Sequence, residues 1–200
     1  MIRRFLECLV ALLMLVLASP LLLVIAIAIV VVSPGNPFYM ATRVGKDGKP
    51  FRMFKFRTMK PDASKLGPVI TSKRDPRIIL IGHFLRRTKL DEFPQFINVL
   101  LGDMALVGPR PEVPEIVALY GPAQVEVLCV KPGITGRVQL EGEESDSIPE
   151  AERAKEYYVK HIMERKLRSD LAYIHSRSLL GDARIVAATA LYLLRSLLRH

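Results

Sequence analysis

The sequence has few of the residues that build several common kinds of site. It contains 200 residues, no tryptophan and only two cysteines, Cys8 and Cys129. Two distant cysteines suggest neither a disulfide framework nor a zinc motif, and they fit a reducing compartment. The four histidines are scattered, and no Walker loop or GxGxxG fingerprint is present. The sequence therefore argues against a disulfide-stabilised secreted domain, a zinc site and the two commonest nucleotide-binding motifs.

Acidic residues are also scarce. The chain has 29 lysines and arginines but only 20 aspartates and glutamates, which gives a formal net charge of +9. Nucleic acid, an anionic membrane surface or a solvated basic face could each account for this charge. Seven basic residues follow the apolar N-terminal segment with only Asp47 opposing them: Arg43, Lys46, Lys49, Arg52, Lys55, Arg57 and Lys60. This position favours membrane lipids as partners and argues against nucleic acid.

A long apolar segment stands at the N-terminus. Residues 5–32 carry one charge, Glu7, and roughly 20 apolar residues suffice to cross a bilayer. Arg3 and Arg4 precede the segment, as in a signal peptide, but the apolar run continues for twelve residues beyond Ser19-Pro20. On hydropathy alone, a plain spanning helix is the first interpretation.

Two features of this segment favour a re-entrant helix over a span. Pro20 removes a helical hydrogen bond in mid-segment, and the Ser19 hydroxyl can bond a freed carbonyl and support a bend. Positive charge flanks both ends, so the positive-inside rule gives neither end a preference for translocation. We therefore predict a membrane helix that is broken at Ser19-Pro20 and returns to the face it entered.

Residues 90–111, LDEFPQFINVLLGDMALVGPRP, hold the strongest functional signal. Adjacent carboxylates, Asp91 and Glu92, suit Mg²⁺, a hard cation that prefers oxygen ligands. They stand at the start of a predicted helix, 93–101, where unpaired N–H groups favour phosphate. The prolines around Arg110 limit its backbone and partly preorganise the guanidinium for a bidentate phosphate contact. Together these parts point to a phosphorylated substrate.

Each part of this motif also has a simpler interpretation. An acidic pair before a helix is most often an N-terminal charge cap, and a Gly-Pro-Arg-Pro segment is most often a stiff connector. The sequence places the two close together, because one helix and one short strand, 104–107, separate them. Their order along the chain therefore favours a shared site.

The remaining pattern predicts an α+β protein: a re-entrant membrane helix and a small helix-rich domain with a short β-hairpin and interfacial helices. We expect an anchor over 1–33, a catalytic domain over 34–178 and an amphipathic C-terminal helix over 179–200, either interfacial or docked on the core. The other expected elements are a hairpin of 38–44 and 51–59, a helix over 78–89, a turn at 131–136, a strand at 137–140, an acidic loop at 141–152 and polar helices within 149–177.

Several ordered motifs resemble one known family. They are KFRTM (55–59), DPRI with a following Gly and Leu-Arg (75–86), LDEFPQFINVLLGDMALVGPRP and KPGITG (131–136). Tyr157, Tyr158, Val159 and Asp170 also fit. The chain resembles the small monotopic phosphoglycosyl transferases of bacteria over nearly its whole length.

The resemblance implies an activity and its partners. Such enzymes transfer a sugar-1-phosphate from a nucleotide sugar, usually a UDP-sugar, to polyprenol phosphate, and they release UMP at the first membrane step of glycan assembly. They require Mg²⁺ and lie on the cytoplasmic face of the inner membrane. A homodimer is one alternative for the assembly. A non-catalytic module that binds polyprenol phosphate or anionic lipid is the alternative function.

The resemblance also assigns roles to residues. Asp91 holds the position of the nucleophile that forms an aspartyl phosphosugar, and Glu92 would help to place Mg²⁺ or orient Asp91. Arg110 and Arg86 are the first candidates for binding phosphate, followed by Lys55 and Arg57. Neighbouring residues at a helix start project in different directions, which argues against a glycosidase-like acid–base pair.

One segment departs from the family pattern. Where relatives commonly have an Asn-Gly-Arg element after KPGITG, this chain has Glu141-Gly142-Glu143. We expect Arg137 to take the role of the missing arginine, with the acidic loop away from the phosphates. The alternative is that Glu143 recognises a polar group on the donor sugar.

Overall fold

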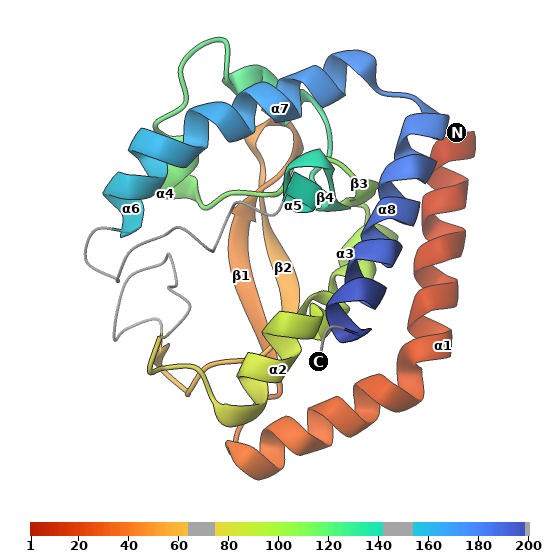
Figure 1. Cartoon of the computed structure of the whole chain (residues 1–200), viewed down its shortest axis with the longest axis vertical. Helices are drawn as coiled ribbons and strands as arrows, with labels where there is room; N and C mark the ends of the chain where they lie inside the picture. Colours follow the sequence, from red (N-terminus) through yellow and green to blue (C-terminus); the bar gives the residue numbers. More distant parts are fainter. Residues whose placement is uncertain (64–74, 142–153, 199–200) are drawn as a thin grey trace.

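The computed structural model describes residues 1–63, 75–141 and 154–198. The described chain is mostly helical and contains two small two-stranded sheets (Figure 1). The α+β class is therefore confirmed. Residues 142–153, which include Glu143 and most of the expected acidic loop, lie outside the described residues, as do residues 64–74.

The N-terminal helix α1 (Ile2–Val32) is long and apolar enough to cross a membrane, with a mean hydropathy of 3.1 over its most apolar 18-residue window. Pro20 lies inside it, and the Ser19 hydroxyl donates to the Val16 carbonyl over 2.8 Å. The helix changes direction about half-way along its length (Figure 1). It is thus bent rather than divided into two helices, because helical structure continues through the proline.

Both halves of α1 pack against the rest of the chain. In the first half, Ala11 is fully buried in a cluster with Met53 and Val99. In the second half, Ile29 is fully buried in a cluster with Phe56 and Leu85 among others. The remaining surface of α1 is largely exposed and apolar, as expected of a helix that meets lipid.

The predicted hairpin is confirmed. Strand β1 (Phe38–Val44) pairs antiparallel with β2 (Pro50–Phe56), and Phe38 lies opposite Phe56. The connection is a short 3-10 turn, η1 (Lys46–Gly48), in which Asp47 and Gly48 both have positive φ. Asp and Gly tolerate that conformation better than other residues, so the sequence marks the turn.

A run of short helices follows. Helix α2 (Leu80–Thr88) ends at Lys89, whose φ of 58° reverses the chain. A 3-10 turn, η3 (Leu90–Glu92), and helix α3 (Gln95–Leu101) come next. The predicted helices at 78–89 and 93–101 are confirmed, each with a start two residues later than expected.

The second sheet corrects the sequence-based expectation. Strand β3 (Ala105–Val107) runs parallel to β4 (Gly133–Thr135), which falls where a turn was expected. The expected strand at 137–140 was wrong, because helix α5 (Arg137–Glu141) occupies it. The pairing depends on close backbone approach: a Cβ on Gly133 would lie 2.1 Å from the Gly108 nitrogen. Glycine there permits a strand contact rather than marking a turn.

Another group of helical segments lies around the turn end of the hairpin (Figure 1). They are α4 (Pro114–Val117), the 3-10 segment η4 (Val125–Cys129), α6 (Ala154–Tyr157), the π-helical turn η6 (Tyr158–Ile162) and α7 (Met163–Ser176). Ile116, Val127, Tyr158 and Leu167 are buried in a core that these segments share. The predicted polar helices are thus confirmed where the structure describes them.

The C-terminal helix α8 (Leu179–Leu198) starts near the beginning of α1 (Figure 1). Arg3 pairs with Asp182 near its start, and Thr189 shares a 2.7 Å hydrogen bond with Thr135. Leu180, Leu191 and Leu194 are exposed on it. Helix α8 therefore docks on the fold along one side and presents apolar side chains on another.

Candidate functional site

The two carboxylates of the motif lie in the turn between α2 and α3. The left-handed conformation of Lys89 ends α2 and lets the chain turn into η3, which carries both residues. Asp91 is 6% exposed and Glu92 8% exposed. Carboxylates are rarely buried without partners, so the contacts of each one decide what the site can do.

Glu92 is held by two cations. The Arg110 Nη2 atom lies 2.7 Å from Glu92 Oε1, and its Nη1 atom lies 3.3 Å from Oε2. The Lys55 Nζ atom donates to Glu92 Oε1 over 2.9 Å. These contacts bring the hairpin, the turn η3 and the segment after β3 to one place. Three residues that the sequence proposed for the site, Lys55, Glu92 and Arg110, are thus in direct contact.

Asp91 differs from its neighbour because one of its oxygens stays unpaired. Within the described chain, Oδ1 of Asp91 is buried and accepts no hydrogen bond. Burial raises the pKa of Asp91, although the charge of Lys55 opposes the rise. Glu92 adds to the rise through repulsion. A desolvated, unpaired carboxylate oxygen is suited to attack an electrophile or to bind a cation.

Glu92 and Lys55 also depart from ordinary ionisation. Burial alone would raise the pKa of Glu92, but the charges of Arg110 and Lys55 outweigh it and hold that pKa well below its usual range. Burial lowers the pKa of Lys55, and the charge of Glu92 limits the fall. Glu92 is therefore ionised at neutral pH. Asp91 is the carboxyl group of the dyad with the higher pKa, so it is the first of the two to take up a proton as the pH falls.

Arg86 approaches the dyad from α2. Its Nε atom donates to the Thr58 hydroxyl over 2.9 Å. Burial lowers the pKa of Arg86, and the negative charges of Asp91 and Asp75 oppose the fall. Arginine remains charged under any such shift, so Arg86 adds a fixed positive charge near Asp91.

Backbone contacts fix the segment that carries Arg110. The Gly108 N–H donates to the Thr135 carbonyl over 3.0 Å, and the Gly133 N–H donates to the Pro109 carbonyl over 2.9 Å. A further bond of 2.9 Å runs from the Val44 N–H to the Glu112 carbonyl. The parallel pair β3–β4 and the end of β1 thus hold Arg110 in place from both sides.

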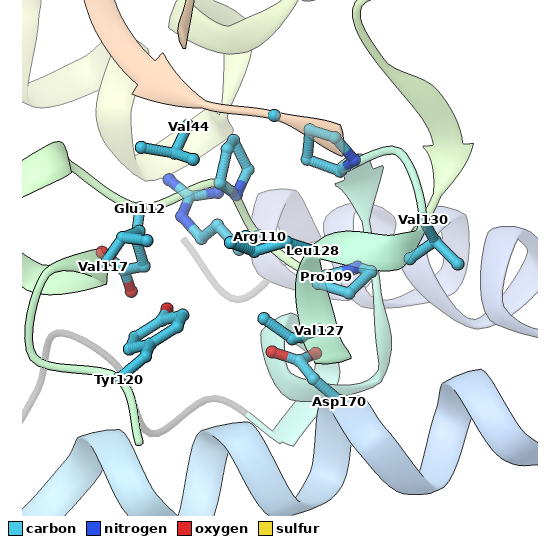
Figure 2. Close-up of a pocket in the computed structure, with 13 residues that line it drawn as sticks. Val44, Pro109, Arg110, Glu112, Val117, Tyr120, Val127, Leu128, Val130 and Asp170 are labelled. Atoms are coloured by element: carbon cyan, nitrogen blue, oxygen red, sulfur yellow. The ribbon is translucent and has the colours of Figure 1, made fainter. Parts of the chain in front are cut away.

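A small pocket adjoins Arg110 on the side of α4 and α7. Figure 2 shows Glu112, Tyr120 and Asp170 around this pocket, with Arg110 across it. Its volume of about 20 Å³ suits a water molecule and is too small for a sugar ring. Lys166 and Tyr158 both bond the Glu112 carboxylate. The contacts of Glu112 thus hold the Arg110 segment against α7 beside this pocket.

Two of the predicted phosphate-binding residues have other surroundings. Arg57 donates to the carbonyls of Ser33 and Pro34, the latter over 3.2 Å, and so binds the end of α1. Arg137 is the first residue of α5 and is exposed. A phosphate-binding role for these two residues stays a prediction.

The sequence interpretation missed two buried amides on α3. Asn98 is fully buried; its Oδ1 accepts from the Phe54 N–H over 2.9 Å, and its Nδ2 donates to the Arg52 carbonyl over 2.7 Å. It thereby braces the strand that carries Lys55. Gln95 is 1% exposed. The available signal was an amide at each position within an otherwise apolar helix.

The structure shows which side chains could coordinate the expected Mg²⁺. Among residues 1–63, 75–141 and 154–198, no group of three or more His, Cys, Asp and Glu side chains is placed to hold a metal. Asp91 offers one unpaired oxygen, whereas both oxygens of Glu92 contact cations. This donor set fits an ion that takes one protein carboxylate and its remaining ligands from substrate phosphates and water.

Comparison with known proteins adds independent findings. The model of the family described as bacterial sugar transferase matches residues 1–196. The chain is 39% identical over 194 residues to the UDP-glucose:undecaprenyl-phosphate glucose-1-phosphate transferase of Escherichia coli, with 94% of this chain and 39% of that protein covered. It is 34% identical over 200 residues to the Caulobacter vibrioides protein of the same name, with 94% and 67% covered.

The name of a third relative specifies a different sugar. The UDP-N-acetylgalactosamine-undecaprenyl-phosphate N-acetylgalactosaminephosphotransferase of Aeromonas hydrophila is 38% identical over 142 residues, with 70% of this chain and 34% of that protein covered. The chain spans about two fifths of the E. coli relative and a third of the Aeromonas relative. The names of these relatives thus share the carrier and the type of transfer but differ in the sugar.

Proposed function

Because the chain belongs to the bacterial sugar transferase family, we propose that it transfers a sugar-1-phosphate from a UDP-sugar to undecaprenyl phosphate. The observation that supports this most directly is the contrast within the dyad: Glu92 is neutralised by Lys55 and Arg110, while Asp91 keeps a buried, unpaired oxygen. One carboxylate therefore organises the site and the other is available to react.

In the first step, an Asp91 carboxylate oxygen attacks the β-phosphorus of the UDP-sugar. A bond forms between that oxygen and the phosphorus, the bond to the bridging oxygen breaks, and UMP leaves with the electron pair. The product is an aspartyl phosphosugar. Burial favours this attack, because a desolvated carboxylate is a stronger nucleophile than a hydrated one.

In the second step, a phosphate oxygen of undecaprenyl phosphate attacks the same phosphorus. The bond to Asp91 breaks, which restores the carboxylate and gives undecaprenyl diphosphate sugar. Two displacements let a soluble donor and a lipid acceptor react in turn at one residue. The enzyme then needs no geometry in which donor and acceptor meet directly.

The reacting groups are all anionic, so fixed positive charge must offset their repulsion. Lys55, Arg86 and Arg110 supply that charge around the dyad. Mg²⁺ bound by Asp91 and the donor phosphates would withdraw charge from the phosphoryl oxygens and the departing UMP. Glu92 would orient Lys55 and Arg110 through its contacts with both side chains.

The proposed anchor is re-entrant, with both ends on the cytoplasmic face. Contacts at both ends of α1 support this. Near the first end, the Arg4 Nη2 atom donates to the Leu100 carbonyl over 3.2 Å. At the other end, Arg57 binds the carbonyls of Ser33 and Pro34. A helix that crossed the bilayer would carry one end about 30 Å away to the opposite face.

A panel of UDP-sugars tests the proposed activity. Purified full-length protein in detergent micelles would receive each donor with undecaprenyl phosphate and Mg²⁺, and released UMP would be measured. We expect release with one donor or a few, and none with Asp91→Asn. Binding of undecaprenyl phosphate without UMP release from any donor would instead favour a non-catalytic lipid-binding module.

A further inference from the structure

The short helix after the dyad carries two buried amide side chains that differ in their hydrogen-bond partners. Asn98 is fully buried and has partners for both its oxygen and its nitrogen. Gln95 is 1% exposed, and its Nε2 atom donates no hydrogen bond within the described part of the chain. One amide is therefore used by the fold, and the nitrogen of the other is not.

Gln95 lies on the same side of the chain as Glu92, the second residue of the dyad. Backbone hydrogen bonds run from Glu92 N–H to the Lys89 carbonyl, from Phe93 N–H to Leu90 and from Phe96 N–H to Phe93, so the run has the three-residue hydrogen bonds of a 3-10 helix. Phe93 and Pro94 also have helical dihedral angles. Side chains three residues apart share one face of such a run, which places Gln95 on the face of Glu92, the neighbour of Asp91.

Two complementary atoms are left unpaired within this short stretch of the chain. Asp91 Oδ1 is a buried acceptor without a donor, and Gln95 Nε2 is a buried donor without an acceptor, among the residues that the structure describes. Folding gains nothing from a buried N–H group in that state, because it has lost its hydrogen bonds to water. Such a group is explained if a ligand provides the missing acceptor.

We propose that Gln95 is a catalytic residue that donates its Nε2–H to an oxygen of the phosphoryl group during transfer. This inference rests on the proposed function. The phosphoryl oxygens gain and redistribute charge as Asp91 attacks, and a preformed donor stabilises that charge without reorganisation. An amide suits this position, because it donates a hydrogen bond and adds no charge to the crowded dyad.

Replacement of Gln95 by methionine removes the donor and keeps a similar volume. We expect Gln95→Met to slow formation of the aspartyl phosphosugar about 10- to 100-fold in single-turnover measurements, at or below the lower end of the roughly 100- to 1,000-fold loss seen when one such donor is removed. The KM for the UDP-sugar should change less than about threefold, because the contact strengthens mainly in the transition state.

Stability provides the readout that separates this role from a structural one. Thermal unfolding followed by circular dichroism should give Gln95→Met a melting temperature equal to or above that of the native chain. Asn98→Leu is the matched control on the same helix, and it should melt lower, since it leaves the Phe54 N–H and the Arg52 carbonyl without their partner.

Two results would overturn the role of Gln95: adduct formation by Gln95→Met within threefold of the native rate, or a fall in melting temperature as large as that of Asn98→Leu. The native protein is measured beside the variant. If the native chain forms no adduct with any donor, the proposed function fails as well. If only the Gln95→Met result differs from expectation, the proposed function stands and this inference alone is lost.

Discussion

Arg110 binds both carboxylate oxygens of Glu92, through contacts of 2.7 and 3.3 Å. Paired hydrogen bonds of this kind fix the plane of the guanidinium as well as its position. The arginine that follows β3 is thereby held against the turn that follows α2, and Lys55 joins the same carboxylate from β2. Glu92 is the point where three separate segments of the chain meet.

Loss of the Glu92 charge should weaken the contacts of this residue with Lys55 and Arg110. We expect Glu92→Gln to lower the rate of UMP release at least about tenfold and to lower the melting temperature, because Lys55 and Arg110 would then repel each other without a buried anion between them. Glu115→Gln, at an exposed carboxylate in α4, is the control and should resemble the native protein. A fully active Glu92→Gln would show that the ion pairs are dispensable.

The pH dependence should report on Asp91. Its carboxylate is the reactive form, and burial raises its pKa, so adduct formation should decline on acidification at a pH above the ordinary aspartate value of about 3.9. Glu92 stays ionised there, because its pKa lies well below the usual range. Since the Lys55 charge lowers the pKa of Asp91, Lys55→Met should move the acidic limb to higher pH. A move to lower pH would contradict this electrostatic account.

The buried, ionised carboxylate of Asp91 should also lower the stability of the folded protein at neutral pH. A group whose pKa is raised on folding favours the folded state while protonated, and this contribution is lost as the pH rises through the folded pKa. Asp91→Asn removes the buried charge, so it should melt about 2–4 °C higher at pH 7, the shift expected for about 1 kcal/mol in a chain of this size. The gain should vanish at acidic pH.

Asp75 provides the control of opposite sign for that experiment. Its side-chain hydrogen bonds to Arg77 lower the pKa of Asp75, and the Arg77 Nη2 atom lies 2.6 Å from Oδ2. Asp75→Asn should therefore melt lower at pH 7, and the loss should shrink as the pH falls through the lowered pKa. If Asp91→Asn and Asp75→Asn both lost stability at pH 7, the assignment of Asp91 as a buried, destabilising carboxylate would be wrong.

The anchor leads to a prediction about membrane topology. In a background without Cys8 and Cys129, single cysteines at Met1 and Asn36 should both resist an impermeant thiol reagent in intact cells and react after permeabilisation. Reaction of either site from outside would show a true span. Pro20→Ala should shift the segment toward spanning, because the alanine N–H can restore the helical hydrogen bond that proline lacks.

Local sequence signals predicted much of the fold. The hairpin of β1 and β2 was readable because its turn residues and β-formers lie next to each other, and the bend in α1 followed from Ser19-Pro20. Asp91, Glu92 and Arg110 could be assigned to one site because they are close in sequence and match a family motif. Lys55 lies 37 positions before Glu92 and was proposed through its motif alone.

The sequence could not predict contacts between segments that are far apart along the chain. The parallel pairing of β3 with β4 joins segments separated by a long connection, so Gly133 resembled a turn glycine until its contact with Gly108 was seen. Arg57 and Arg110 were both proposed to bind phosphate, yet Arg57 lies near Ser33 and Pro34 and binds the end of α1. The contrast between Gln95 and Asn98 depends on hydrogen-bond partners that no periodicity encodes.

Intact-protein mass spectrometry tests the central claim most directly. Full-length protein in detergent, incubated with its UDP-sugar and Mg²⁺ but no undecaprenyl phosphate, should gain the mass of one sugar-phosphate group and release UMP in equal amount. Peptide mapping should place the group on Asp91, and later addition of undecaprenyl phosphate should remove it. Asp91→Asn should gain no mass. Full turnover by Asp91→Asn, or rapid native turnover with the group found on another residue, would contradict the account.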